Sequence, residues 1–211
     1  MVVYYCYSNH ADAGYNACVF AYGQTSAGKT HTMMGPRGGQ EMGMVRSEWG
    51  LLPRASEFLF SELEMKASSG SFSYNAKASF FQIYNEKLMD LLGGHTAHDT
   101  NLRIREIPHK SSVPSQSGSH PFEVFIAGLS EFRVHTAEDI LKVLAAGSAA
   151  RATRSTNFNA TSSRSHAVLQ ISFEMESVEP HGQTTIYRFT SLVDNIMNMM
   201  VMVMVCMCIC V

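Results

Sequence analysis

The sequence predicts an α/β fold in which helices flank a mixed central sheet. Runs that alternate apolar and polar residues, as half-buried strands do, occur at residues 72–84, 167–175 and 185–193. Segments at residues 51–63 and 136–150 instead place apolar side chains at helical spacing. A chain of 211 residues is long enough for one substantial domain, and no shift in composition divides it clearly into two.

A glycine-containing loop follows an apolar, strand-like run at residues 16–22. Gly23, four further residues and then Gly28, Lys29 and Thr30 have the spacing of a phosphate-binding loop. Because glycine lacks a Cβ, the backbone can turn sharply and bring its N–H groups close to phosphate oxygens. Lys29 would contact the β and γ phosphates, Thr30 would ligate Mg²⁺, and a helix beginning near Gly28 would direct the positive end of its dipole at the same anion.

The strand before this loop and the helix after it favour a P-loop NTPase type of sheet over an incidental surface turn. The pattern therefore predicts a bound nucleoside triphosphate with Mg²⁺. The residues expected to bind the nucleotide form one continuous segment: Gly23, Gln24, Thr25, Ser26, Ala27, Gly28, Lys29 and Thr30.

The elements after this loop are expected in the following order. Residues 35–50, which contain five glycines, predict an irregular loop, and Pro53 lies near the start of the helix at residues 51–63. Residues 88–92 predict a short helical turn after the strand at residues 72–84. Two more strand-like regions lie at residues 102–107 and on both sides of Gly128, separated by a serine-rich loop at residues 110–121.

Two further signals mark the second half of the chain. Thr136, followed three residues later by Asp139, has the spacing of a capping box at the start of the helix at residues 136–150. The strands at residues 167–175 and 185–193 are expected to form a hairpin, and the second of them delivers Asp194 at its C-terminal end.

Composition gives little indication of a polyanionic partner. Sixteen basic and eighteen acidic residues leave a net charge of −2, so bulk charge gives no argument for nucleic acid or an anionic membrane. The five cysteines, three of them at positions 206, 208 and 210, do not form a disulfide framework. A metal site in that run is disfavoured, because no histidine or carboxylate accompanies the cysteines.

The two ends of the chain differ from the rest. The N-terminus has no basic segment and too short an apolar run for a signal peptide, so secretion is not expected. Residues 196–211 are almost entirely Met, Val, Cys and Ile, but they number fewer than the roughly twenty residues that cross a bilayer as a helix. We expect an atypical lead at residues 1–13 and an aberrant apolar tail at residues 195–211.

A second polar motif lies between the helix at residues 136–150 and the strand at residues 167–175. It contains Asn159, Ser162, Ser163 and Arg164. Adjacent hydroxyls can ligate Mg²⁺ and orient an attacking water, and a guanidinium can hold a carboxylate through two hydrogen bonds. Taken alone, the motif favours a solvated loop of Ser and Thr residues.

In combination, these segments closely resemble the kinesin motor domain. The resemblance rests on Gly14-Tyr15-Asn16 with the sequence from Phe20 to Met33, on Ile83-Tyr84-Asn85-Glu86-Lys87 with Asp90-Leu91-Leu92, and on the sequence from Asn159 to His166. These pieces follow the family's order across residues 14–194. The resemblance implies an ATPase that moves along microtubules, with ATP and Mg²⁺ as cofactors, tubulin as partner and a location on the cytoskeleton in the cytoplasm.

The resemblance also implies roles for single residues. Ser162 with Asn159 would lie near the γ-phosphate and the attacking water. Arg164 would form the ion pair that links the family's two nucleotide-sensing switches, and Asp194 matches the first residue of the second switch. The implied catalytic residues are Asn159, Ser162, Ser163 and Arg164, and the implied metal-site residues are Thr30, Ser163 and Asp194.

The chain departs from the family after Asp194. The family continues with Leu-Ala-Gly-Ser-Glu, whereas Met197 stands here in place of the glycine that senses the γ-phosphate, and Met199 in place of the glutamate that pairs with Arg164. Without them, hydrolysis would lose its water-positioning network and its conformational relay. Residues 1–13 do not supply the family's first strand, which predicts a sheet that is incomplete at both ends, with backbone groups left unpaired.

Two other functions remain open. A small nucleotide kinase would need a lid with several arginines, and Arg37, Arg46 and Arg54 are too scattered to form one. A degenerate domain would bind nucleotide or tubulin without turnover, because the second switch is missing. The sequence holds no heptad repeat, and it indicates neither oligomeric state, subfamily, direction of travel nor cargo.

Overall fold

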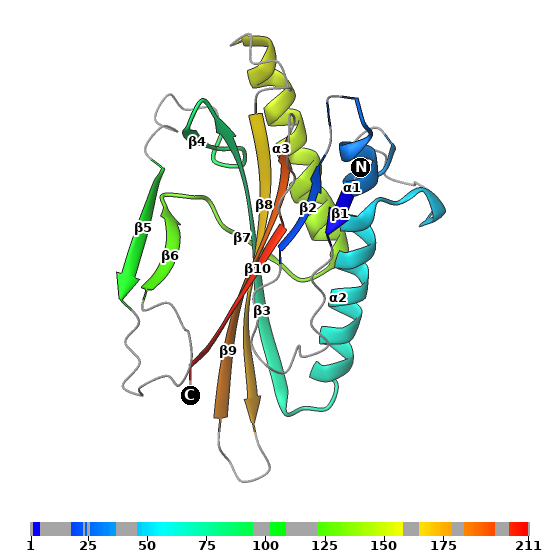
Figure 1. Cartoon of the computed structure of the whole chain (residues 1–211). Coiled ribbons are helices and arrows are strands. Elements are labelled where there is room, and N and C mark those ends of the chain that lie inside the picture. Colours follow the sequence, from blue (N-terminus) through cyan, green and yellow to red (C-terminus); the bar gives the residue numbers. More distant parts are fainter. Residues whose placement is uncertain are drawn as a thin grey trace.

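An eight-stranded sheet runs through the middle of the computed structural model (Figure 1), which describes residues 2–4, 18–22, 24, 26–36, 46–94, 102–108, 122–157, 165–178, 184–196 and 203–210. The strand order is β1 (Val2–Tyr4), β2 (Cys18–Tyr22), β9 (Thr184–Ile196), β8 (Ser165–Val178), β3 (Phe72–Tyr84) and β4 (Lys87–Asp90). In addition, β10 (Val203–Cys210) pairs with β9, and β7 (Phe132–Val134) pairs with β3. β2 and β9 are parallel and the other pairs are antiparallel, so the predicted mixed sheet is confirmed.

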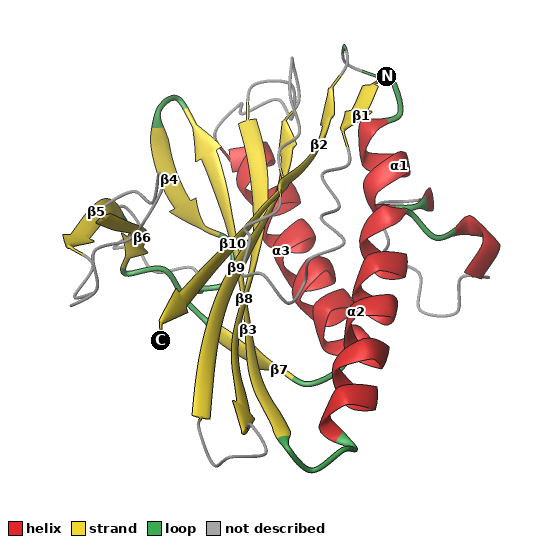
Figure 2. Cartoon of the chain, turned by 60° about the horizontal axis from the view of Figure 1, so that its bottom comes forward, coloured by secondary structure: helices red, strands yellow, loops and turns green. Residues whose placement is uncertain are grey.

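Three helices cover one face of this sheet (Figure 2): α1 (Lys29–Met34), α2 (Leu51–Ala67) and α3 (Ala137–Asn157). A short 3₁₀ helix, η3 (Arg46–Glu48), precedes α2. The second helix packs against both of the others. The core fills the space between helices and sheet, and its buried side chains include Phe60, Leu63, Phe80, Val134, Ile140, Leu144, Leu169, Ile171 and Phe173.

The close approach of α3 to β3 depends on a glycine. A Cβ at Gly147 would overlap the ring of Phe80. Because side chains alternate along a strand, Ala76, Ala78 and Gln82 share the helix-facing side of β3 with Phe80. Small residues on both elements therefore allow the helix to lie directly on the sheet.

The strongest sequence patterns are confirmed. The strand expected at residues 72–84 is β3, with both ends as predicted. The second and third helices form as expected but continue further, to Ala67 and Asn157. β8 and β9 form the predicted antiparallel hairpin. The strands expected at residues 102–107 and around Gly128 are β5 (Arg103–Pro108), β6 (Phe122–Ala127) and β7.

The helical turn predicted at residues 88–92 is wrong. The chain forms strand β4 there, which pairs antiparallel with the end of β3. Asn85 and Glu86 connect the two strands, and both have positive φ, 48° and 62°. Two such residues make a tight turn whose twist suits a hairpin. The apolar residues after the turn cover too short a run for periodicity to separate helix from strand.

The outer edge of β2 is paired, contrary to the expectation that residues 1–13 supply no strand. Val2 lies opposite Tyr22, and Tyr4 lies opposite Phe20. β10 pairs with β9 from residue 186 to residue 193. These pairings satisfy backbone groups that were expected to lack partners. The boundaries expected for the lead and the tail, residues 1–13 and 195–211, stay a prediction.

The loop expected at residues 110–121 and most of the loop expected at residues 35–50 lie outside the described residues. In the part of the chain that the structure describes, no helix has the length and apolar character needed to span a membrane.

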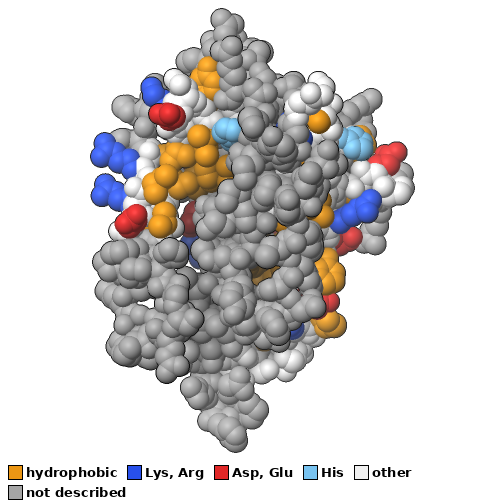
Figure 3. All heavy atoms as spheres, viewed as in Figure 1, with side chains coloured by type: hydrophobic (Ala, Val, Ile, Leu, Met, Phe, Trp, Pro, Cys, Tyr) orange, Lys and Arg blue, Asp and Glu red, His pale blue; other side chains and the backbone are white. Residues whose placement is uncertain are grey.

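Strands β5 and β6 form a separate two-stranded sheet at the side of the molecule (Figure 1). Several of its apolar side chains are exposed, among them Ile104, Ile107, Val124 and Phe125. Figure 3 shows apolar side chains gathered near basic ones on this side of the molecule. The hairpin packs little against the other described elements.

Candidate functional site

The phosphate-loop pattern lies between β2 and α1, as predicted. The Ala27 N–H donates to the Gln24 carbonyl oxygen at 3.1 Å and closes a turn. Ser26 and Gly28 have left-handed backbone conformations, with φ of 66° and 82°. A Cβ at Gly28 would meet no atom within 4 Å, so the space beside the residue is open. Glycine suits this position because of its positive φ and not because of crowding. The helix then begins at Lys29, which confirms the predicted start.

Lys29 is held inside this loop. Its side chain is 4% exposed, and Nζ donates to the Gln24 carbonyl oxygen at 2.7 Å. Burial lowers the pKa of Lys29, because desolvation disfavours the ammonium form. In the first turn of α1, the backbone N–H and Oγ1 of Thr32 donate to the Gly28 carbonyl oxygen at 2.9 and 3.1 Å. A buried ammonium beside open space and a helix start suits an anionic ligand.

The strand order brings the end of β2, the end of β9 and the start of β8 together at one end of the sheet. Asp194 in β9 pairs with Phe20 in β2 on one side and with Val168 in β8 on the other. Two residues further on, Ile196 pairs with His166 at the start of β8. The end of β2, which leads into the phosphate loop, thus lies two strand spacings, about 10 Å, from the start of β8.

Several predicted site residues lie outside the described part of the chain. They are Gly23 and Thr25 in the phosphate loop and Asn159, Ser162, Ser163 and Arg164 in the second motif. For Asp194 the structure describes the backbone alone, in β9 between β2 and β8. Their contacts with nucleotide and metal stay predictions. Thr30 is placed in the first turn of α1 and is partly buried.

The structure adds Arg151, which the sequence reasoning did not include in the site. Its Nη2 donates to the carbonyl oxygen of Ser165 at 3.2 Å and to its Oγ at 3.0 Å. Ser165 is 2% exposed and opens β8 directly after the second motif. Helical spacing could have indicated this residue, because Arg151 lies one helical turn beyond Gly147. It was missed because the helix was expected to end at about residue 150.

His166 follows Ser165 and is partly buried. Its Nδ1 is buried and has no hydrogen-bond partner among the described residues. Burial and the positive charge of Arg151 lower the pKa of His166, which keeps the imidazole neutral near pH 7. Among the described side chains, the start of β8 therefore lies beside the permanent positive charge of Arg151 and carries a neutral histidine.

The end of α1 packs tightly against the start of α2. A Cβ at Gly50 would lie 2.5 Å from backbone atoms of Met33, Met34 and Gly35. No side chain fits there unless one of the helices moves. This contact fixes the direction in which α1 leaves the phosphate loop.

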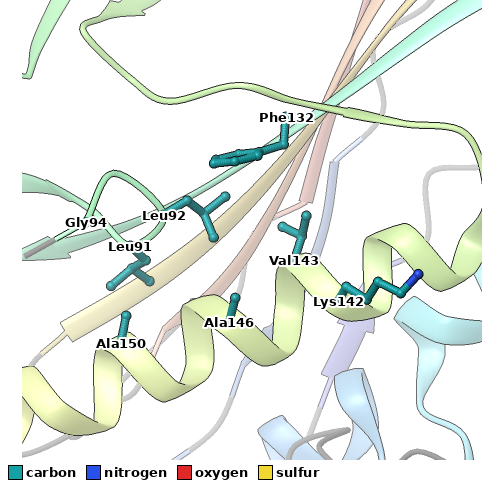
Figure 4. Close-up of a pocket in the computed structure, with 8 residues that line it drawn as sticks. All are labelled: Leu91, Leu92, Gly94, Phe132, Lys142, Val143, Ala146 and Ala150. Carbon is teal, nitrogen blue, oxygen red and sulfur yellow. The ribbon is translucent and has the colours of Figure 1, made fainter.

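A cavity of about 420 Å³ lies elsewhere, between α3, β7 and the segment after β4 (Figure 4). It is lined by Leu91, Leu92, Gly94, Phe132, Lys142, Val143, Ala146 and Ala150. The lining is apolar except for Lys142, whose Nζ is paired with Glu138 at 3.2 Å and Asp139 at 3.4 Å. Such a wall offers few partners for phosphate oxygens. β4 is also at the far end of the sheet from β2, so this cavity is separate from the phosphate loop.

A family model described as "Kinesin motor domain" matches residues 7–195. The chain belongs to this family. The kinesin-like protein Klp98A of Drosophila melanogaster is 43% identical over 161 residues, which make up 76% of this chain and 11% of that protein. The kinesin-like protein KIN-12D of Arabidopsis thaliana is 40% identical over 159 residues, 74% of this chain and 5% of that protein.

A solved structure titled "Structure of a fast kinesin: Implications for ATPase mechanism and interactions with microtubules" is similar in fold, with a TM-score of 0.66 and 29% identity. The match covers 88% of this chain and 45% of that chain. The kinesin resemblance and the P-loop NTPase fold class are thereby confirmed. Kinesin motor domains in general are microtubule motors that bind nucleotide with magnesium, and this chain spans only a small part of the kinesin relatives it matches.

Proposed function

We propose that this chain binds Mg·ATP in the loop between β2 and α1, and that the protein containing it uses ATP hydrolysis to move along microtubules in the cytoplasm. The proposal depends on the burial of the Lys29 ammonium at the start of a helix. The loop before it contains Ser26 and Gly28, which have left-handed backbone conformations. Within the chain, we assign the motor sequence to residues 14–194, with a lead before it and an apolar tail after it.

The residues at this loop fit the proposed ligand. Gly28 leaves open space beside the backbone, and the Lys29 ammonium, which donates to a loop carbonyl oxygen, would bind phosphate oxygens more strongly than that neutral acceptor. Thr30 would ligate Mg²⁺ together with Ser163 and Asp194. In the proposed hydrolysis, water breaks the phosphoanhydride bond between the β and γ phosphates of ATP. Asn159 and Ser162 are proposed to orient the attacking water, and Arg164 to link the two switches.

The first experiment tests nucleotide binding. Lys29→Met keeps the length of the side chain and removes its charge, and loss of a charge-assisted hydrogen bond of about 1.5–3 kcal/mol predicts about 10- to 100-fold weaker binding of fluorescent Mg·ATP. Lys77→Met is the matched control, because Lys77 lies on β3, away from the loop, and forms an exposed ion pair with Glu131. Equal affinity for Lys29→Met and the unmodified chain would contradict the proposed site.

A second candidate function is binding of nucleotide or tubulin without turnover. It is favoured by Met197 and Met199, which stand where the family has glycine and glutamate. Phosphate release from Mg·ATP, measured with and without microtubules, separates the two functions. Microtubule-stimulated release supports the motor, whereas tight Mg·ATP binding with no release supports the second candidate.

A further inference from the structure

The last strand, β10, lies in a segment that is rich in sulfur and that the proposed nucleotide site does not use. Residues 197–210 contain six methionines and three cysteines. For β10 the structure describes the backbone and its antiparallel pairing with β9. Successive residues of a strand alternate between its two sides. One side of β10 therefore carries four residues with sulfur: Met204, Cys206, Cys208 and Cys210.

This side of β10 belongs to the face of the sheet that points away from the helices. Val205 pairs with Ser191 of β9, which pairs with Ile171 of β8. Ile171 is part of the core between the sheet and the helices, so Val205 is on the core side and Cys206 is on the other side. On that other side β8 carries Glu174, which is exposed. The described helices cover only the core side (Figure 2), so they leave the cysteine-bearing side of β10 uncovered.

A basic residue lies opposite the central cysteine of this row. Cys208 pairs with Arg188 of β9, and Arg188 pairs in turn with Glu174 of β8. A nearby arginine lowers the pKa of a cysteine and favours its thiolate form, which is the form that binds metal ions. Two thiolates on one monovalent cation leave an excess negative charge. Arg188 offsets this charge, although it shares its own charge with Glu174.

The spacing of the cysteines along the strand limits what they can bind. Neighbours on one side of a strand lie about 6.6 Å apart, whereas the Cβ atoms of a disulfide lie about 3.5–4.5 Å apart. Met204 and Cys210 lie about 20 Å apart, so the four residues cannot surround one ion as a tetrahedral zinc site requires. A metal–sulfur bond of about 2.3 Å allows one ion to join two sulfur atoms up to about 4.6 Å apart. Two neighbouring cysteines on the strand can meet that limit if each side chain leans slightly toward the other.

We propose that β10 binds Cu(I), held between Cys208 and one of its two neighbours, Cys206 or Cys210. Cu(I) is a soft ion that accepts two ligands in a linear arrangement, and thiolate and thioether sulfur select it. The lack of histidine and carboxylate in this run, which disfavours zinc, does not disfavour Cu(I). Cys208 is the shared ligand, because it has a neighbouring cysteine on each side along the strand. The site does not depend on the proposed binding of nucleotide.

The test is competition for Cu(I) between the full, reduced chain and the coloured Cu(I) chelator bicinchoninate, in the absence of oxygen. The unmodified chain is expected to withdraw one Cu(I) per molecule from the chelator. Cys208→Ser is expected to abolish this, because it leaves Cys206 and Cys210 about 13 Å apart along the strand. Cys206→Ser and Cys210→Ser each keep one neighbouring pair and are expected to retain one Cu(I). Cys18→Ser is the control, because Cys18 lies on β2.

Two results would overturn the proposal. The first is a chain that withdraws no Cu(I), and the second is a Cys208→Ser variant that binds Cu(I) as tightly as the unmodified chain, since Cys206 and Cys210 would then converge as they do not in a strand. Circular dichroism shows whether each variant folds. If Cys208→Ser does not fold, the double variant Cys206→Ser with Cys210→Ser removes both neighbouring pairs and is expected to lose Cu(I). Tight Zn²⁺ binding that is lost in each of the three single variants would also contradict the proposal, because it requires ligands that converge on one ion.

Discussion

Asp90 is a single buried carboxylate that joins two segments through three backbone N–H groups. It is 2% exposed and lies at the end of β4. Oδ1 accepts the backbone N–H groups of Leu92 and Gly93 at 2.8 and 3.1 Å, and Oδ2 accepts that of Ser130 at 2.8 Å. The carboxylate thereby supplies acceptors for loop N–H groups that no strand pairing satisfies, and it ties the end of β4 to the chain that enters β7.

Substituting Asp90 is therefore expected to destabilise the fold. Asp90→Ala leaves three backbone donors without acceptors, and we expect a loss of roughly 3 kcal/mol or more in the free energy of unfolding. Asp90→Asn retains one acceptor oxygen and is expected to lose less. Urea denaturation at neutral pH measures both. Glu131→Gln is the control, because its exposed ion pair with Lys77 is worth at most about 1 kcal/mol; equal losses in Asp90→Ala and Glu131→Gln would contradict the assignment.

Asp139 gives stability a dependence on acid pH. Its Oδ2 accepts the backbone N–H groups of His135 and Thr136 at 3.0 and 3.2 Å, and Thr136 Oγ1 accepts the Asp139 N–H at 3.2 Å, which confirms the capping box. The pKa of Asp139 lies below its ordinary value of 3.8, and the largest cause is the hydrogen bond from the His135 backbone. Hydrogen bonds with Thr136 and Lys142 and the positive charge of Lys142 lower the pKa further, whereas partial burial raises it.

A lowered pKa in the folded state stabilises the protein above the unfolded value, and this contribution is lost as pH falls through the folded pKa. We expect the stability difference between the unmodified chain and Asp139→Asn to be constant at neutral pH and to shrink below about pH 4. Urea midpoints measured from neutral to acid pH check this. A difference that stays constant down to about pH 2 would contradict it.

At the scale of elements, sequence predicts best where one pattern is long. The alternation at residues 72–84 fixed both ends of β3, because thirteen residues of strand leave little ambiguity. The end of α3 was not predictable in this way. Its last turns are rich in Thr and Ser, which favour helices weakly, and the contact of Arg151 with Ser165 helps to hold them. The hairpin at Asn85-Glu86 was missed because its turn has no glycine, the usual signal for positive φ.

Gly147 gives a sharp test of how α3 packs on the sheet. In an exposed helix Gly→Ala stabilises by about 1 kcal/mol, but here the added Cβ would overlap the ring of Phe80. Overpacking costs about 1–3 kcal/mol, so we expect Gly147→Ala to lose stability despite its better helix propensity. Ala149→Gly, at an exposed position of the same helix, should cost about 1 kcal/mol through propensity alone. Urea denaturation of both variants decides, and a more stable Gly147→Ala would refute this packing.

At the scale of the whole molecule, the candidate site depends on strand order. Local sequence predicts the loop before α1 and the polar motif before β8, but it does not show that β9 lies between β2 and β8. That neighbourhood arises from pairings between segments far apart in the chain, such as Phe20 with Asp194. The order of motifs in a known family could predict it, whereas periodicity and turn signals could not.

The same topology predicts that the β5–β6 hairpin unfolds locally, before the central sheet does. β3 and β8 pair along their whole length in the middle of the sheet and carry buried side chains such as Phe80 and Leu169. The β5–β6 hairpin lies outside that sheet, with Ile104 65% and Val124 62% exposed, and an isolated two-stranded hairpin is marginally stable. We therefore expect its amides to exchange at least about tenfold faster than those of β3 and β8.

The dependence of these exchange rates on urea concentration tests this prediction. The exchange rates of the hairpin amides should rise with a shallow slope, because little surface becomes exposed when the hairpin opens, and those of the central amides with the slope of global unfolding. Hydrogen exchange with mass spectrometry resolves the two groups, and equal rates and slopes would show that the hairpin and the central sheet unfold as one unit.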